Sequence, residues 1–203
     1  LSYPVAVWGG LAGIVGLVAF AAHLGIAWWL GAVFFVIYFA LALAITRMRA
    51  ELGTPVHDLH GTGPEMLLTR TFGTRTFDDQ TLVGFGLLQW FNRAYRSHPM
   101  PHQLESFKLA DVSGAERRSW TIALVGFGAV SAFAAFWVFL DQMYRYGAAS
   151  EVRYAYGYES FARIAGWMNT RTNGDWGEVA AVGVGVGVAT ALQFARLTIP
   201  GFF

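Results

Sequence analysis

The stretch LGIAWWLGAVFFVIYFALALAIT, Leu24–Thr46, contains no charged residue and no proline. A helix needs about 20 consecutive apolar residues to cross the ~30 Å hydrocarbon layer of a membrane, and this stretch is long enough. The whole chain shares the bias, because 55% of its residues are hydrophobic, 13% are charged and its mean hydropathy is +0.43. Soluble domains carry roughly a quarter charged residues. The sequence therefore predicts an all-α, polytopic membrane protein.

Three further stretches pass or nearly pass the same length test: Tyr3–Ala22, Ser119–Leu140 and Val179–Ala195. We expect about four transmembrane helices, with re-entrant or interfacial helices between them. The predicted units are a transmembrane hairpin (1–46), a polar connecting region (47–118), a transmembrane helix (119–146), an interfacial amphipathic segment (147–178) and a last transmembrane helix with a truncated end (179–203). The chain starts at Leu1 rather than Met, so we expect it to belong to a longer polypeptide.

Composition and motifs exclude several classes of protein. The chain has no cysteine, which excludes disulfides and thiolate metal sites. Its formal net charge of +1 argues against a nucleic-acid partner, which requires a basic face. The sequence has no Gly-rich phosphate loop, nucleophile elbow or HExxH motif. We therefore predict that the protein is not an enzyme and has no cofactor.

The connecting region begins with TRMRAELGTPVHDLHGTGPEMLLTRTFG, Thr46–Gly73, which ends a nearly uncharged run. The region 47–118 holds nine of the 14 Lys and Arg residues and four of the five histidines. The GTGPE turn and the short apolar stretch Gln80–Phe91 have two interpretations. They form either an element that dips into the protein or a solvated loop with an interfacial helix, because unpaired backbone is not tolerated in lipid.

Ionisable residues near a membrane tend to mark transport or relay sites. Arg47, Arg49 and Glu51 leave the second span together, and the spacing of Arg47 and Glu51 predicts an ion pair on one helical face. The alternative is that these are ordinary interfacial charges at a helix end. The connecting region also contains candidate ligands for ions or protons: His57, Asp58, His60 and Glu65.

Histidines are the only candidates for a metal site. His57, His60, His98 and His102 have the right chemistry for zinc or another transition metal, but their spacing matches no closed site. We therefore predict no metal. The prolines Pro99 and Pro101 also argue against a helix that runs through His98.

One amphipathic pattern precedes the last span. Tyr158, Phe161 and Ile164 recur at helical spacing, whereas Glu159 and Arg163 fall on another face. The pattern predicts a helix lying at the membrane surface.

Two stretches resemble the bacterial branch of the oligopeptide transporter superfamily. The first stretch, TRMRAELGTP…GTGPEMLLTRTFG, matches a signature in which a membrane helix ends in a charged, glycine-containing motif. The second, HQLESFKLADVSGAERRSW, resembles that superfamily's QDFKxGxxxGAxPR segment. The matching positions are Arg47, Glu51, Gly53, Phe72, Gly73, Phe107, Lys108, Gly114, Ala115 and Arg118. An uncharacterised family of large bacterial membrane proteins, distantly related to these transporters, is more similar still.

The resemblance implies a secondary, proton-coupled transporter of peptides or metal chelates in the bacterial inner membrane. Taken with the charge pattern above, it leads us to expect the substrate or ion pathway at Arg47, Arg49, Glu51, His57, Asp58, His60, Glu65, Glu105 and Lys108. We expect Arg47, Glu51 and Lys108 to face one interior cavity. The expected partners are the lipid bilayer and the rest of a longer polypeptide or other membrane subunits, with a homo-oligomer as one arrangement.

Two other functions stay open from the residues alone. The protein is a structural or accessory subunit if its aromatic and Gly-lined helix faces pack on other subunits. It is a metal-dependent membrane enzyme if the histidines converge on an ion.

Overall fold

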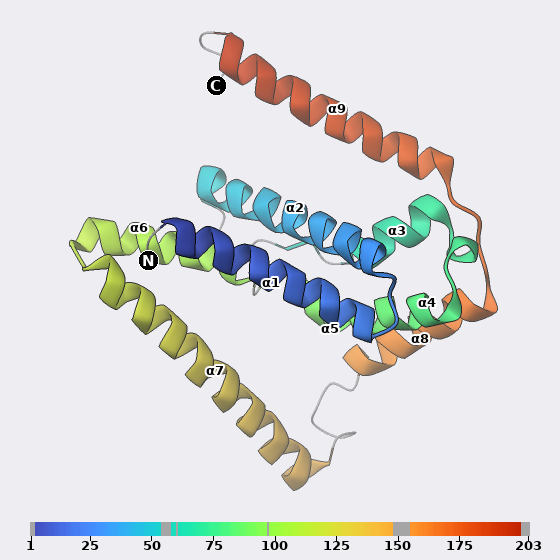
Figure 1. Cartoon of the computed structure of the whole chain (residues 1–203), viewed down its shortest axis with the longest axis horizontal. Helices are drawn as coiled ribbons and strands as arrows, with labels where there is room; N and C mark the ends of the chain where they lie inside the picture. The colour runs from blue at the N-terminus through green and yellow to red at the C-terminus, as the bar shows by residue number, and fades with distance from the viewer. Residues whose placement is uncertain (1–2, 54–57, 60, 97, 148–154, 200–203) are drawn as a thin grey trace.

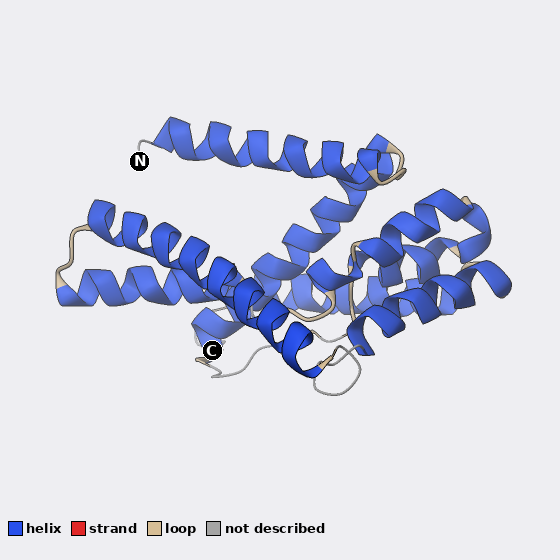
Figure 2. Cartoon of the chain, turned by 90° about the horizontal axis from the view of Figure 1, so that it is seen from below, coloured by secondary structure: helices blue, strands red, loops and turns tan. Residues whose placement is uncertain are grey.

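The computed structural model describes residues 3–53, 58–59, 61–96, 98–147 and 155–199, and these residues form helices joined by short loops, with no strand in the described part (Figures 1 and 2). Four helices are long and apolar enough to cross a membrane: α1 (Tyr3–His23), α2 (Trp28–Leu52), α7 (Arg117–Tyr146) and α9 (Trp176–Thr198). The predicted all-α membrane fold with four spans is confirmed.

The first two helices form the predicted hairpin, but α2 ends later than its apolar run. The helix continues through Arg47, Arg49 and Glu51 because these are good helix formers, and Arg47 Nε donates a 2.8 Å hydrogen bond to Glu51. Gly53, with φ of 63°, ends it in a left-handed cap. The predicted Arg47–Glu51 pair is therefore confirmed, inside the helix rather than beyond it.

Short helices pack beside α2 in place of a solvated loop. They are α3 (Pro64–Phe72), the 3₁₀ turn η1 (Thr74–Thr76), α4 (Asp79–Leu87), α5 (Gln89–Asn92) and α6 (Pro99–Ser113). The main core is made by Leu30, Phe34, Leu68 and Phe85 with their neighbours, so apolar side chains of α3 and α4 are buried against the apolar helix α2. These contacts favour the element that folds into the protein over a solvated loop, and its depth in the membrane stays a prediction.

Residues 79–113, which we call the parallel segment, follow α2 along its length. At the start of α2, Gln80 fills the space beside Gly25. Farther along, Phe85 stacks on Phe34 with ring centroids 5.8 Å apart. The contacts continue in order, with the ring centroids of Phe91 and Tyr38 4.6 Å apart and those of Tyr95 and Tyr38 5.7 Å apart. At the far end, Glu105 pairs with Arg49, with Oε2 2.8 Å from Nη2.

The described residues 53, 58–59 and 61–72, which we call the antiparallel segment, return along α2 in the opposite direction. Leu59 packs near Tyr38 and Ile45, in the second half of α2. Leu68 then joins the core at Phe34. The polypeptide therefore runs beside α2 twice between Gly53 and Ser113, and both segments are partly helical and partly irregular.

The parallel segment is interrupted near Tyr38, between α5 and α6, and the described residues 58–59 and 61–63 of the antiparallel segment are irregular there too. This irregular backbone is hydrogen-bonded. The amide of Gly61 donates to the carbonyl of Arg93 at 3.3 Å, and the amide of Tyr95 donates to Asp58 at 3.2 Å. Helices α3 and α6 start here with Pro64 and Pro99, which favour the first turn of a helix. Each irregular stretch thus supplies a hydrogen-bond acceptor for a backbone amide of the other, so the two stretches form one structural unit.

Helix α8 (Ala155–Asn169) packs on α4 and α5. Ile164 lies against Gly86, where an added Cβ would be 2.2 Å from Ile164 Cγ1. A helix on the membrane surface would turn its charged face to water. In α8 this face instead turns Glu159 and Arg163 toward α3 and α5. Tyr158 and Phe161 are exposed on the other face, and their position at a membrane surface stays a prediction.

The remaining spans, α7 and α9, lie on the outside of this packed region (Figure 1). Neither contains a buried residue in the part that the structure describes. Helix α9 is linked to the end of α2 by hydrogen bonds from Arg47 to Gln193 (2.9 Å) and from Arg196 to Glu51 (3.0 Å).

Candidate functional site

The breaks in the two segments bring a cluster of polar side chains together beside Tyr38. The contributing elements are the first turn of α3, the helix α5, the irregular residues 93–96 and the inward face of α8. We call Glu65, Gln89, Asn92, Arg93, Tyr95, Glu159 and Arg163 the polar cluster. None of the four described spans carries a member of it.

Glu65 is the centre of the polar cluster. Its side chain is 2% exposed, and its Oε2 accepts a 2.7 Å hydrogen bond from Asn92 Nδ2. Arg163 Nη1 approaches Oε1 at 3.4 Å. Gly63 makes room for this carboxylate, because a Cβ at Gly63 would lie 2.3 Å from Oε2.

Burial decides the protonation preference of Glu65. Desolvation raises the pKa of the carboxyl group above its ordinary value of 4.5, because burial penalises the charged form. The hydrogen bond from its own backbone amide, the Asn92 amide and the charge of Arg163 oppose this effect without overcoming it. Glu65 is therefore an acid that holds its proton more tightly than an exposed glutamate.

A line of alternating charges leads away from Glu65. Arg163 also donates to Glu159, one turn earlier on α8, at 3.5 Å. The other carboxylate oxygen of Glu159 accepts a 2.8 Å hydrogen bond from Arg93 Nε. Glu65 and Arg93 are thus connected through Arg163 and Glu159.

The polar cluster also contains buried polar atoms without a partner among the described residues. They are both amide atoms of Gln89, Oδ1 of Asn92 and the hydroxyl of Tyr95. Burial raises the pKa of Tyr95, so this hydroxyl keeps its proton. Buried polar atoms normally find a protein or water partner, and unpaired ones are costly. Their concentration here indicates a site that accommodates water or a polar ligand.

Two cavities adjoin the polar cluster. One, of about 220 Å³, lies between α5 and α8 and is lined by Gln89, Arg93 and Ser160, with Gly86 and Gly157 opening its walls. The other, of about 240 Å³, is lined by Tyr38, Ala94, Tyr95 and His98 beside α2. Arg93 and Tyr95 therefore line open space, whereas the unpaired polar atoms of the cluster are themselves buried.

The whole chain, residues 1–203, matches the family described as "Family of unknown function (DUF6785)". The chain belongs to this family. No curated protein and no solved structure matches it. For this DUF6785 member, the function has to be argued from the polar cluster itself.

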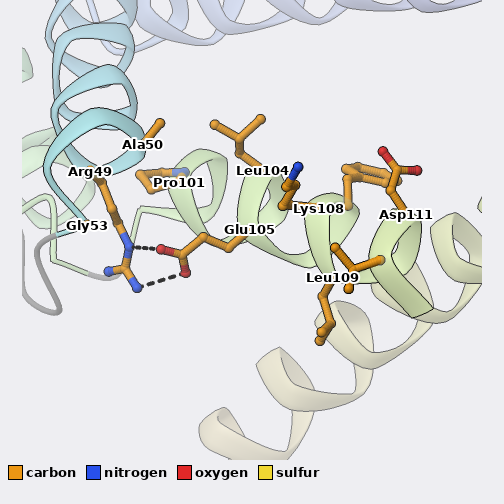
Figure 3. A pocket seen from close by; sticks show the side chains of 11 residues that line it. Arg49, Ala50, Gly53, Pro101, Leu104, Glu105, Lys108, Leu109 and Asp111 are labelled. Carbon is orange, nitrogen blue, oxygen red and sulfur yellow. Dashed lines mark hydrogen bonds and ion pairs between the residues drawn. The ribbon is translucent and has the colours of Figure 1, made fainter. Parts of the chain in front are cut away.

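The predicted pathway residues fall in three places. Glu65 is the centre of the polar cluster, and Asp58 lies beside it, bonded to the Tyr95 amide and 3.0 Å from Arg96 Nη2. Arg49, Glu105 and Lys108 line an open hollow of about 710 Å³ at the far end of α2, where Glu105 reaches across to Arg49 (Figure 3). Arg47 and Glu51 contact α9. His57 and His60 lie outside the described residues.

The expectation that Arg47, Glu51 and Lys108 face one cavity is wrong. Lys108 lines the hollow with Arg49, whereas Arg47 and Glu51 contact Gln193 and Arg196 on α9. The reason is helical geometry. Positions 47 and 49 are two residues apart, roughly 200° around the helix axis, and so point to opposite sides.

The described histidines do not converge. His98 precedes α6, as its prolines predict, and its Nδ1 accepts a 3.2 Å hydrogen bond from the Met100 amide. The ring of His98 also lies against Tyr38 and Tyr95, with centroid distances of 5.6 and 6.0 Å. His102 is exposed, one turn into α6. Within the described residues, no group of three His, Cys, Asp or Glu side chains is placed to hold a metal ion.

Sequence reasoning missed most of the polar cluster. Gln89, Asn92, Arg93 and Tyr95 belong to QWFNRAYR, which overlaps the end of the short apolar stretch Gln80–Phe91. Polar residues within an apolar segment can indicate a buried polar site. The stretch was too short to span a membrane, however, so the sequence did not show whether it lies inside the protein. Glu159 and Arg163 were expected on another face of a helix at the membrane surface, and no local pattern pointed to their partners outside α8, which lie at least 66 positions away.

Proposed function

We propose that the protein is a secondary transporter coupled to protons, in the bacterial inner membrane, and that the polar cluster lies on its substrate or ion pathway. One observation carries the proposal: the buried carboxylate of Glu65 lies where two interrupted segments meet beside a spanning helix. Transporters commonly place their sites at interrupted helices, since irregular backbone at membrane depth is tolerated only where it is buried or lines a cavity.

The chemistry of the polar cluster suits proton coupling. A coupling acid must take up and release a proton within the working pH range, which for a carboxyl group requires an upward pKa shift. The pKa of Glu65 is shifted in that direction by burial. Ionisable residues in membrane proteins that face an interior cavity are frequently parts of proton relays.

The substrate class in this proposal comes from the resemblance to oligopeptide transporters. It comprises small peptides and metal chelates, which carry both charge and amide groups. The polar cluster offers guanidinium, carboxylate and amide groups beside a cavity of about 220 Å³.

Reconstitution tests the proposal directly. The purified protein is placed in liposomes containing a pH-sensitive dye, and di- and tripeptides and metal chelates are added outside under an inward proton gradient. We expect at least one compound to accelerate acidification, and Glu65→Gln to abolish this effect. Glu178→Gln, which removes an exposed glutamate 3.7 Å from Arg70, is the matched control and should retain it.

Two outcomes would contradict transport. The first is wild-type protein for which no compound in either class moves protons. The second is a Glu65→Gln variant that acidifies the liposomes as fast as wild type does, since the carboxyl group would then have no part in coupling.

A second candidate function is supported by α7 and α9. Their described residues include no buried side chain, and α7 exposes Phe133, Phe136 and Trp137. Such faces suit a structural or accessory subunit that packs on other membrane helices. Native mass spectrometry of the protein in lipid nanodiscs distinguishes the two, because stoichiometric foreign subunits favour the accessory function.

A further inference from the structure

The four charged side chains of the polar cluster have unequal surroundings. Glu65 is buried at one end, whereas Arg93 is about a quarter exposed at the other end and lines the 220 Å³ cavity. Arg163 and Glu159 connect them through contacts of 3.4, 3.5 and 2.8 Å. A change of charge at the buried end therefore reaches the cavity through two intermediate side chains.

The charge balance of this line depends on one proton. With Glu65 ionised, two carboxylates neutralise two guanidiniums. When Glu65 takes up a proton from the aqueous phase, the line keeps two guanidiniums and one carboxylate, and its net charge becomes +1. Glu159 is then the carboxylate shared by both arginines, and a stronger contact with Arg163 weakens its contact with Arg93.

The other groups around Glu65 do not cancel this charge. Asn92 is neutral, and Tyr95, in the interrupted part of the parallel segment, stays neutral because burial raises its pKa. Tyr38 of α2 contacts Tyr95 and is uncharged. Asp58 is engaged with the Tyr95 amide and Arg96. Within the line of four charged side chains, the excess positive charge therefore falls on Arg163 and Arg93.

We propose that Glu65, Arg163, Glu159 and Arg93 form a charge relay, in which proton uptake by Glu65 opens a binding site for a carboxylate-bearing small molecule at Arg93. The site is the cavity between α5 and α8. This inference rests on the proposed transport function and identifies how proton and ligand are linked at the same site. Binding of ligand and proton then favour each other, as thermodynamic linkage requires.

The chemistry of the cavity selects an anion rather than a metal cation. The guanidinium of Arg163, 3.4 Å from Glu65, would repel a metal cation at that carboxylate. A proton on Glu65 neutralises the carboxylate and can be present beside the guanidinium. Arginine binds carboxylates through paired, charge-assisted hydrogen bonds. At roughly 30 Å³ per water, the cavity holds the equivalent of about seven waters, which is enough for a small acid.

Weak binding of acetate in detergent tests the relay without transport. Saturation-transfer NMR is recorded for acetate, and for acetamide as the uncharged analogue, while the pH is lowered from about 8 to about 5.5, where most acetate remains ionised. We expect acetate binding to wild-type protein to rise as the pH falls, and acetamide binding to stay unchanged. Glu65→Gln should bind acetate equally at every pH, because its relay carries the +1 charge permanently.

Variants at the other end of the relay complete the test. Arg93→Gln should lose acetate binding at every pH while its thermal unfolding stays cooperative. Arg70→Gln, which removes an exposed arginine paired with Glu178 at 3.7 Å, should follow wild type. The relay is overturned if wild type shows no acetate binding at low pH, if Glu65→Gln keeps the wild-type pH dependence, or if Arg93→Gln binds acetate normally.

Failure of the relay and failure of the transport proposal have different signatures. If acetate binding does not depend on Glu65 but Glu65→Gln still abolishes proton movement in liposomes, the relay is wrong and transport stands. If acetate binding follows the relay but no compound moves protons, the transport proposal is wrong and the binding site stands.

Discussion

The side-chain amide of Asn92 donates a 2.7 Å hydrogen bond to Oε2 of Glu65, and both side chains are buried. These residues belong to the two segments that run in opposite directions beside α2. The bond therefore joins the segments at their breaks, and the carboxylate that it holds is the most buried acid described in the chain.

Glu65→Gln should change the pH dependence of stability. The pKa of Glu65 is raised in the folded state, so folding takes up a proton between pH 4.5 and the raised pKa. The stability contributed by this protonation is present at low pH and is lost as the pH rises through the folded pKa, by at most about 1.4 kcal/mol per pH unit. Thermal unfolding of wild type and variant across this range measures the difference. Parallel curves would contradict the assignment.

Asn92→Ala should raise the pKa of Glu65 further, because the amide hydrogen bond stabilises the charged form. The titration of the carboxyl band, identified by its absence in Glu65→Gln, is followed by infrared spectroscopy. The midpoint should move to higher pH, and the variant should lose about 1–3 kcal/mol of stability. Asn173→Ala removes an exposed amide and serves as the control. An unchanged midpoint would show that the hydrogen bond is unimportant.

Gly73→Ala should destabilise the protein more than Gly147→Ala. Both glycines have nearly the same backbone conformation, with φ and ψ of 78° and 151° for Gly73 and 76° and 147° for Gly147, a region that other residues rarely adopt. Only Gly73 is crowded, since its Cβ would lie 2.4 Å from the backbone nitrogen of Gly174. The strain of about 1–3 kcal/mol is thus common to both variants, and the contact with Gly174 adds to it only at Gly73. Equal losses in thermal unfolding would refute the close approach.

Ala94→Cys should react with a charged, membrane-impermeant methanethiosulfonate, whereas Val36→Cys should not. Ala94 lines the cavity that Tyr38 also lines, and Val36 is two residues from Tyr38 on an exposed face of α2. Water in the cavity allows the reactive thiolate to form, but lipid keeps a thiol protonated. The natural chain has no cysteine, so the labelling is specific. Equally slow labelling of the two variants in liposomes would mean that the cavity is dry. Equally fast labelling would mean that Val36 is not in lipid.

The membrane fold follows from composition and run length, and these are local properties. The span Leu24–Thr46 has no charge that would need a partner, so its environment is decided by its own residues. Its boundary was less predictable. The helix continues to Leu52, because the end of an apolar run is not the end of a helix and Gly53 supplies the stop.

Glu65 could be selected as a candidate from the sequence, but its partners could not. Asn92 and Arg163 are 27 and 98 positions away, and no local pattern identifies such pairs. The same limitation explains why Arg47, Glu51 and Lys108 were wrongly expected to share a cavity. Motif residues can be adjacent in sequence and still point to opposite sides of one helix.

The sequence by itself therefore determined that this chain is helical, lies in a membrane and gathers its charges in one central region, because hydrophobicity and charge are carried by each residue. Only the tertiary structure decided which charges are buried together. The return of two interrupted segments along α2 brings Glu65, Asn92 and Arg163 within hydrogen-bonding or ion-pair distance, and that proximity depends on how the entire chain folds back on itself.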